Sequence, residues 1–368
     1  MGAIETEGAV MRPSVSVLIP YYNDSRFLRE SITSVLEQEF ADFELVLVNH
    51  ASTDGSRAIA RSFSDPRIVH VDMPFNHGAG GGLVVAEFLN VARGEYVKFF
   101  CADDVMRSDC LAKLVDHMDS HPGLSFAFGD LEYINASGKD LGAHWFEDRP
   151  KFSADLTETD CLRLFAAGHS FLPWVGSIVR RSALSEIELD ATMVMMFDMS
   201  VWAQLLLGGH RLGFVESVLA SYRVHDGQVS ALAHRNEAIC LSVCERQVFF
   251  RYFQRCRDVA LVKEVFADDV FVQRIRVAED IPLAVALRYV SADRYAVWAY
   301  QYVHDCLQDP AKRTEAEERM GLTVAGFRGM IRRQDEQPRK KSRWMRFRDR
   351  WLRFRRSDGS DEFGKYSL

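Results

Sequence analysis

The sequence lacks long hydrophobic runs. Among its 368 residues there is no stretch of 18 or more apolar residues, and its first residues contain no basic segment leading into an apolar run. Membrane-spanning helices and standard export signals both need such runs. We therefore expect a protein that does not span a membrane and is not exported by a standard signal.

Cysteines are few and irregularly spaced. The seven cysteines form an odd-numbered set without C-x-x-C spacing. Disulfide frameworks in small secreted domains use even sets, and zinc ribbons use closely paired cysteines. We expect neither in this chain.

Several nucleotide-binding and catalytic signatures are also absent. The glycine-rich stretch 77–82 lacks the Gly-Lys-Ser/Thr ending of a phosphate loop, and Leu83 stands where a dinucleotide fingerprint has its third glycine. The chain contains neither a G-x-S-x-G nucleophile elbow nor an HExxH motif. With these signatures absent, our hypothesis for the chemistry of this protein is a metal-assisted reaction of a diphosphate.

Acidic residues exceed basic ones, and the basic ones are unevenly placed. The net charge is −7, but residues 339–356 carry ten Lys and Arg against one acid, so the rest of the chain has a net charge of −16. An acidic body is not suited to coat nucleic acid, and we expect no such partner. Hydrophobic residues make up 48% of the chain, enough to form the core of two or three folded units.

Short apolar strands alternate with helices over the first hundred residues. The pattern predicts strands at 16–20, 44–48, 67–71 and 95–100, with helices at 26–38, 55–63 and up to residue 93. Strands that are apolar on both faces and alternate with helices form parallel sheets covered on both sides. The fold class is therefore α/β, with a mostly parallel central sheet that gains antiparallel members after residue 124.

Polar residues follow each predicted strand. In open α/β sheets, ligands bind beyond the carboxyl ends of the strands. We therefore expect one crevice to be formed by the segments Tyr21–Asp24, Asn49–Asp54, Asn76–Gly82 and Cys101–Asp104.

Adjacent carboxylates, Asp103 and Asp104, directly follow an apolar strand. Two neighbouring acids repel each other unless a hard divalent cation such as Mg²⁺ or Mn²⁺ neutralises them. The alternative is a solvated turn in which an Asp caps the helix that starts near Ser108. Residue pattern alone leaves both interpretations open.

Other side chains could serve the same crevice. Asp54 and Asp198 each stand at a helix start, where an acid is either an N-cap or a functional group, for Asp198 a general base. Arg223 and His225 alternate along an extended segment and so share one face, where they could meet a phosphate or a metal. Trp174 could stack on a sugar ring, although a Trp among apolar neighbours usually packs in the core.

Four collinear stretches resemble the inverting glycosyltransferases of family 2, which have the nucleotide-diphospho-sugar-binding GT-A fold. The stretches are VSVLIPYYND (15–24), LVLVNHASTDGS (45–56), ARGEYVKFFCADDV (92–105) and the segment 197–230. Together they span residues 15–230. The resemblance implies a Rossmann-like GT-A sheet with a nucleotide-binding half (15–105) and an acceptor-binding half (106–232).

The resemblance also implies roles for individual residues. Asp198 corresponds to the catalytic base, and Trp174 lies on the acceptor side. The nucleotide-sugar-binding residues are Pro20, Tyr21, Tyr22, Asn49, Asp54, Asp103 and Arg223, and the metal-binding residues are Asp103, Asp104 and His225.

The chain departs from the family pattern at three places. Asn49 and His50 stand where the family usually has two acids, Cys101 stands at the first acid of an Asp-x-Asp-Asp element, and Phe197 replaces the acid before the base. These departures bear on base recognition and on how the metal is held.

Taken together, the resemblance predicts a metal-dependent transferase. It implies a Mn²⁺ or Mg²⁺ cofactor, a nucleotide-diphospho-sugar donor with UDP-sugars as the first choice, and a saccharide or lipid-linked acceptor in surface polysaccharide or glycolipid assembly. The alternative is a catalytically inactive relative that binds a nucleotide or scaffolds a membrane assembly.

Beyond residue 232 the sequence predicts a helical module at 233–309, a polar linker at 310–338 and a basic tail at 339–368, while residues 1–14 form an N-terminal extension. Four aromatic residues of the tail recur at helical spacing among arginines: Trp344, Phe347, Trp351 and Phe354. A helix of this composition suits an anionic membrane surface. Rival interpretations are a solvated tail and a nucleic-acid arm. The membrane interpretation predicts a peripheral protein on the cytoplasmic face.

Overall fold

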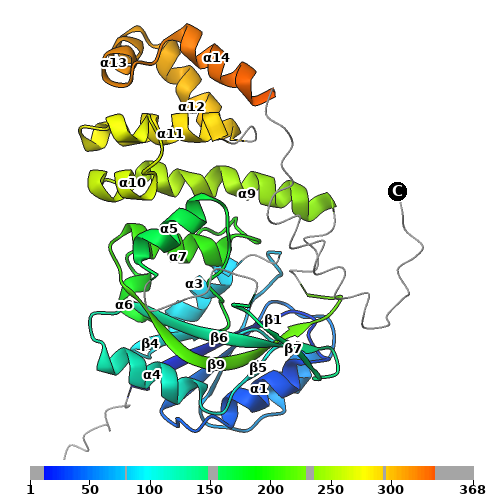
Figure 1. Ribbon diagram of the computed structural model, residues 1–368. Coiled ribbons are helices and arrows are strands. Elements are labelled where there is room, and N and C mark those ends of the chain that lie inside the picture. Colours follow the sequence, from blue (N-terminus) through cyan, green and yellow to red (C-terminus); the bar gives the residue numbers. More distant parts are fainter. Residues whose placement is uncertain (1–11, 79–80, 148–155, 229–235, 293–295, 336–368) are drawn as a thin grey trace, which may run out of the picture.

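The structure, a computed structural model, describes residues 12–78, 81–147, 156–228, 236–292 and 296–335 (Figure 1). Residues 339–368, and with them the predicted membrane-binding stripe, lie outside these ranges. Among the described residues, no helix has the length and apolar character needed to cross a membrane.

Four parallel strands form one half of the central sheet. They are β1 (Val15–Tyr21), β2 (Phe43–Asn49), β3 (Ile68–Asp72) and β4 (Tyr96–Phe99), in the spatial order β3-β2-β1-β4. The strands are joined by α1 (Leu28–Leu36), α2 (Ser56–Arg61) and α3 (Gly81–Val91). The predicted parallel sheet is confirmed, and its carboxyl ends all lie at one edge.

The second half of the sheet is mixed. Its strands are β5 (Val105–Met106), β6 (Phe126–Asn135), β7 (Asp140–His144), β8 (Ser177–Arg180) and β9 (Leu212–Val224). β8 runs antiparallel to both β4 and β6, and β9 runs parallel to β6 and antiparallel to β5. The predicted antiparallel members are confirmed. The helices of this half are α4 (Cys110–Ser120), α5 (Glu158–Ala166), α6 (Arg181–Leu184) and α7 (Phe197–Leu207).

Helices cover both faces of the sheet. On one face, α1 and α4 pack on the strands through buried residues that include Leu28, Ile32, Leu111 and Leu114. On the other face, one hydrophobic cluster continues from the strands through α5 and α7 into the C-terminal helices. The helical region therefore shares its core with the sheet domain.

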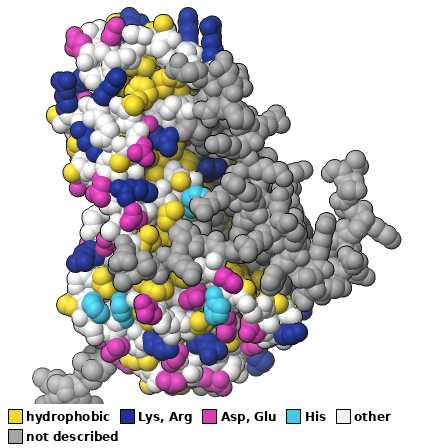
Figure 2. All heavy atoms as spheres, viewed as in Figure 1, with side chains coloured by type: hydrophobic (Ala, Val, Ile, Leu, Met, Phe, Trp, Pro, Cys, Tyr) yellow, Lys and Arg dark blue, Asp and Glu magenta, His cyan; other side chains and the backbone are white. Residues whose placement is uncertain are grey.

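The C-terminal helices stack outward from α5 and α7 (Figure 1). They are α9 (Asn236–Arg255), α10 (Val259–Val265), α11 (Ile281–Ala292) and α12 (Val297–Gln308), with short 3-10 turns at Val272–Arg274 and Ala278–Asp280. The predicted helical region is confirmed. On the face seen in Figure 2, basic and acidic side chains are interspersed rather than segregated by sign.

The prediction of a polar linker at 310–338 was wrong over most of its length. Two helices, α13 (Pro310–Met320) and α14 (Val324–Asp335), occupy residues 310–335 and contact α12 and α11. Asp309 caps α13 by accepting hydrogen bonds from the N–H groups of residues 311 and 312, and Pro310 stands at its first turn. A few apolar residues in a highly charged segment suffice to bury one side of each helix: Ala316, Met320, Phe327 and Met330.

Candidate functional site

The loops that follow β1 and β2 are joined to each other. Asn23 Oδ1 accepts hydrogen bonds from Thr53 N at 2.8 Å and from Asp54 N at 3.3 Å. Asn23 and Ala51 both have positive φ, at 56° and 58°, a conformation that non-glycine residues seldom adopt. Such backbone strain is concentrated at functional sites, where the surrounding contacts hold it in place.

Asp54 fastens the same two loops. Its carboxylate accepts hydrogen bonds from Ser56 N at 2.9 Å and from Ser25 N at 3.2 Å. Burial alone would raise the pKa of Asp54, but the hydrogen bonds from Ser56 and Ser25 outweigh it and lower the pKa to about 2. The structure thus gives Asp54 a loop-joining role at the predicted edge of the sheet.

Asp103 and Asp104 lie between β4 and β5, at the same edge. Asp104 is 1% exposed, and its Oδ1 accepts a hydrogen bond from Arg223 N at 2.7 Å, while its Oδ2 has no hydrogen-bond partner. Asp103 Oδ2 lies 2.9 Å from His225 Nε2. Burial and then the charge of Asp103 raise the pKa of Asp104 well above its usual range.

This pair fits a hard divalent cation. One ligand atom from each of Cys101, Asp103 and Asp104 lies within 4.8 Å of the others. Carboxylate oxygens suit Mg²⁺ or Mn²⁺, whereas the soft sulfur of Cys101 does not. A buried carboxylate oxygen without a donor is costly, and a cation between the two acids would satisfy it. The predicted carboxylate pair is therefore chemically suited to the metal that the sequence suggested.

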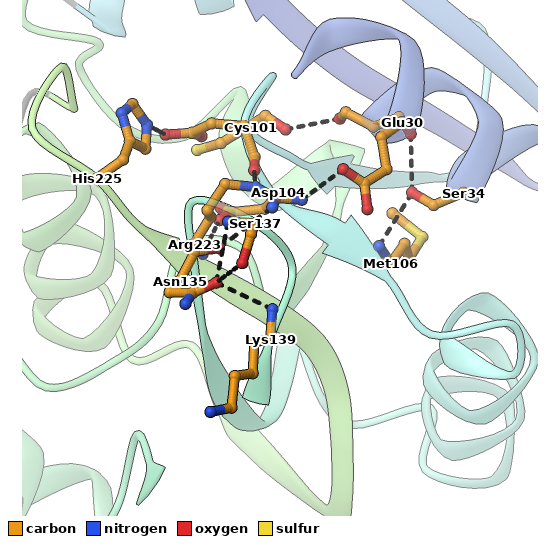
Figure 3. A network of polar contacts seen from close by, with 12 residues as sticks. Glu30, Ser34, Cys101, Asp104, Met106, Asn135, Ser137, Lys139, Arg223 and His225 are labelled. Atoms are coloured by element: carbon orange, nitrogen blue, oxygen red, sulfur yellow. Dashed lines mark hydrogen bonds and ion pairs between the residues drawn. The ribbon is translucent and has the colours of Figure 1, made fainter. Parts of the chain in front are cut away.

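Arg223 lies beside Asp104 and between Glu30 and Asn135 (Figure 3). It is 2% exposed. Its guanidinium donates to Asp103 O at 2.7 Å, to Glu30 Oε2 at 2.7 Å and to Asn135 O at 3.3 Å. These contacts hold the acidic loop against α1 and β6, and the expected binding of Arg223 to the nucleotide-sugar stays a prediction. His225, one residue beyond β9, remains beside Asp103.

Asp24 is a residue of this edge to which the sequence analysis gave no role. Its Oδ2 accepts a hydrogen bond from Tyr22 N at 2.8 Å. Burial raises the pKa of Asp24 to about 6. The hydrogen bond from Tyr22 lowers this pKa, whereas the charges of Asp103 and Asp54 raise it further. These influences place Asp24 among the acids at this edge of the sheet, which only its position after β1 could have indicated.

The predicted nucleotide-binding residues of β1 differ in exposure. Tyr21 is buried in the core, and burial raises its pKa to about 12. Tyr22 is 44% exposed, and Pro20 is half-buried. Of these three residues, Tyr22 is the one whose side chain is open to a ligand.

Asn49 and His50, the two departures from the family pattern, form contacts across the end of β2. Asn49 Nδ2 donates to Asp72 Oδ1 at 2.9 Å. His50 Nε2 accepts from His77 N at 2.9 Å, and the two imidazoles stack at 5.8 Å. Burial and then His77 lower the pKa of His50. A neutral amide and a neutral imidazole thus occupy the positions where two acids were expected.

Asp198 lies in the first turn of α7, one residue past its start, so it is not the N-cap. Its Oδ1 accepts a hydrogen bond from Met199 N at 2.7 Å. Burial raises the pKa of Asp198 to about 6. The backbone N–H groups of Met199 and Asp198 partly offset this rise, and the charge of Glu245 adds to it. A carboxylate with that pKa is ionised at neutral pH yet basic enough to accept a proton.

Trp174 and Gly81 connect the start of α7 to the strand ends. Trp174 stacks on Phe99 of β4 at 3.9 Å and also contacts Phe197 at 5.7 Å. A Cβ at Gly81, the first residue of α3, would overlap the Phe197 ring, so only glycine permits this approach. Trp174 is partly buried and packs against the core, where it joins Phe99 of β4 to Phe197, the first residue of α7.

Comparisons with known proteins agree with this geometry. Residues 16–188 match the family described as glycosyl transferase family 2. TuaG of Bacillus subtilis (strain 168), whose name refers to teichuronic acid biosynthesis, is 27% identical over 222 residues, 60% of this chain and 82% of TuaG. WfgD of Escherichia coli, named as a UDP-Glc:alpha-D-GlcNAc-diphosphoundecaprenol beta-1,3-glucosyltransferase, is 33% identical over 121 residues, 33% of this chain and 47% of WfgD.

The fold has solved counterparts. The crystal structure of S. aureus TarS residues 1–349 has a TM-score of 0.54 at 15% identity and covers 89% of this chain and 93% of that one. The same TarS fragment in complex with UDP has a TM-score of 0.53 at 16% identity, covering 84% and 93%. The sheet order, the acids at the strand ends and these matches lead to one conclusion: the fold is GT-A, residues 16–188 match glycosyl transferase family 2, and the protein is a glycosyltransferase.

Proposed function

We propose that the protein is a metal-dependent, inverting glycosyltransferase that moves a sugar from a nucleotide-diphospho-sugar to an acceptor hydroxyl. The observation that carries the proposal is Asp104 Oδ2, a buried oxygen without a hydrogen-bond partner, beside Asp103 at the end of β4. Two such acids are unfavourable in the folded protein unless a cation belongs between them.

The donor end of the reaction is assigned to the acids after β4. Asp103 and Asp104 would hold the divalent cation, with His225 next to Asp103. When bound, a divalent cation neutralises the charge that develops on the departing nucleoside diphosphate. Arg223 fixes the acidic loop through its hydrogen bonds to Asp103 O and Glu30, so it acts on the donor through the loop.

The acceptor end is assigned to Asp198. The acceptor oxygen attacks the anomeric carbon from the side opposite the diphosphate, and the bond from that carbon to the diphosphate oxygen breaks. Asp198 takes the proton of the acceptor hydroxyl during the attack. A pKa of about 6 suits this role. One displacement assisted by one base inverts the configuration of the sugar.

Similar proteins suggest the substrate class. TarS was crystallised with UDP, and WfgD is named for a UDP-Glc donor and a diphosphoundecaprenol-linked acceptor. TuaG is named for a cell-surface polymer. We therefore assign this chain a UDP-sugar donor and a saccharide or lipid-linked acceptor in surface polysaccharide or glycolipid assembly. The basic aromatic tail supports peripheral binding at the cytoplasmic face of the membrane.

The test is donor turnover by the full-length protein. UDP-sugars are supplied with Mn²⁺ or with EDTA, and release of UDP is measured for the wild type, Asp104→Ala and Asp198→Asn. Asp305→Asn, a change of an exposed acid on α12, is the matched control. We expect turnover that needs Mn²⁺, is lost in both site variants and is retained in the control. Full activity in both site variants would refute the assignment.

A further inference from the structure

Glu245 of α9 accepts hydrogen bonds from the backbone of the segment just before α7. Its Oε1 accepts a hydrogen bond from Val194 N at 2.8 Å. Its Oε2 accepts from Met195 N at 2.9 Å and from Met196 N at 2.8 Å. Glu245 is 4% exposed. A buried carboxylate bonded to three successive backbone amides is a strong and directional contact.

The three amides belong to the two residues that precede the N-cap of α7 and to the N-cap itself. Met196 is the N-cap of this helix, and no side chain of its own segment caps it. The first amides of a helix need acceptors, and the helix dipole favours a negative charge at this end. Glu245, about 50 residues further along the chain, accepts the N-cap amide of Met196 and brings a negative charge to this end from another helix. The position of α7, and of Asp198 in its first turn, thus depends on α9.

We propose that Glu245 is a positioning residue for the transfer reaction, which fixes the start of α7 so that Asp198 faces the acceptor hydroxyl. This inference rests on the proposed role of Asp198. It gives the C-terminal helices a part in the reaction, because α9 completes the acceptor side of the site. Glu245 acts through the backbone of residues 194–196 and does not itself touch the reacting atoms.

Several charged groups surround this contact. The charge of Glu245 raises the pKa of Asp198. The charge of Asp190, in the segment before α7, in turn raises the pKa of Glu245, after the larger effect of burial. At the far end of α9, Arg255 pairs with Glu188 at 3.1 Å, in an ion pair whose partners are both exposed. Arg255 therefore joins the same two parts of the protein without touching the start of α7, which makes it a matched control.

The first experiment compares Glu245→Gln with Arg255→Gln in full-length protein, using UDP-sugar turnover as a function of pH. The side-chain oxygen of Gln can replace one carboxylate oxygen as acceptor. Its NH₂ group is a donor, so it cannot accept a hydrogen bond from the remaining backbone N–H groups. We expect kcat of Glu245→Gln to fall roughly 100-fold with donor KM unchanged, because small misplacements of a catalytic group have effects of that order. Arg255→Gln should match the wild type.

The pH profile separates positioning from a loss of folded protein. Removing the charge of Glu245 takes away an influence that raises the pKa of Asp198. The acid limb of the kcat profile should therefore move to lower pH in Glu245→Gln and stay in place in Glu245→Asp, which keeps the charge. Wild-type kcat together with an unmoved acid limb in Glu245→Gln would overturn the proposal.

A second measurement does not depend on turnover. Hydrogen exchange followed by mass spectrometry reports the amides of residues 193–199 and, separately, those of 201–207. We expect at least tenfold faster exchange in the first segment of Glu245→Gln, with the second unchanged. Unchanged exchange in both segments would overturn the role of Glu245 even if no donor were turned over. Absence of turnover in the wild type would instead count against the proposed function.

Discussion

Changing Asp198 to Asn should stabilise the protein while abolishing transfer. Burial above all raises the pKa of Asp198 from 3.8 to about 6, so its ionised form is disfavoured in the folded state. Each tenfold change in an acid constant corresponds to ~1.4 kcal/mol, which gives an upper bound of about 3 kcal/mol for the cost of ionisation. Asn carries no charge, and its oxygen can still accept the hydrogen bond from Met199.

The sign of the pH dependence follows from the direction of the shift. Because the folded protein holds the Asp198 proton more tightly than the unfolded chain, the wild type loses stability as pH rises from about 4 to about 6. Below pH 4 the carboxyl is protonated in both states, and Asp198→Asn should have no advantage from charge. Above pH 6 the advantage should be complete.

Urea unfolding followed by circular dichroism between pH 4 and pH 8 measures this difference. The matched control is Asp54→Asn, since hydrogen bonds lower the pKa of this exposed carboxyl to about 2. The stability that Asp54 contributes is present above pH 4 and is lost as pH falls toward 2, so its removal should destabilise the protein at neutral pH. If Asp198→Asn were no more stable than the wild type at pH 8, the reasoning about its environment would be refuted.

Three further predictions concern the metal pair, the start of α3 and the tail. Asp104→Asn should raise the thermal midpoint in EDTA, because it removes a carboxyl whose ionisation the folded protein disfavours. It should also lose the further rise that Mn²⁺ and UDP give the wild type, and a retained rise would contradict the site. Gly81→Ala should lower the free energy of unfolding by about 1–3 kcal/mol through overlap with the first ring of α7, whereas Gly123→Ala, with open space around it, should cost much less; equal losses in urea unfolding would exclude the close approach. Replacing Trp344 and Trp351 together by Ser should reduce co-sedimentation of the full-length protein with anionic lipid vesicles, and unchanged sedimentation would rule out the membrane role of the tail.

Local patterns were enough to predict the parallel half of the sheet. β1 and β2 are apolar on both faces and are followed by helices, so both their structure and their burial follow from the residues themselves. The mixed half was predicted only in kind. β5 has two residues, and its partner β9 lies more than 100 residues away, so no local pattern could predict that pairing. The helices at 310–335 were missed because few apolar residues anchor them.

The same distinction applies to the site. Asp103 and Asp104 stand next to each other after a strand, and this local feature indicated a metal site. The contacts of Arg223 come from Glu30 in α1 and Asn135 in β6, far apart in sequence, so its buried position could not be predicted. Glu245 carried no motif at all. Its function as a cap becomes visible only when α9 and α7 lie together.

The surroundings of Asp54, Asp104 and Asp198 differ while their chemistry is the same, and this supports a division of roles. Asp54 accepts hydrogen bonds from two backbone amides and has a lowered pKa, so it is satisfied without a ligand. Asp104 is buried with one oxygen unsatisfied, which only a cation or a proton can correct. Asp198 lies in the first turn of α7 and has a pKa of about 6, which suits proton transfer at neutral pH. A turn made only of helix-capping acids would give all three the environment of Asp54, and the contrast among them therefore argues for a metal-binding pair and a separate base.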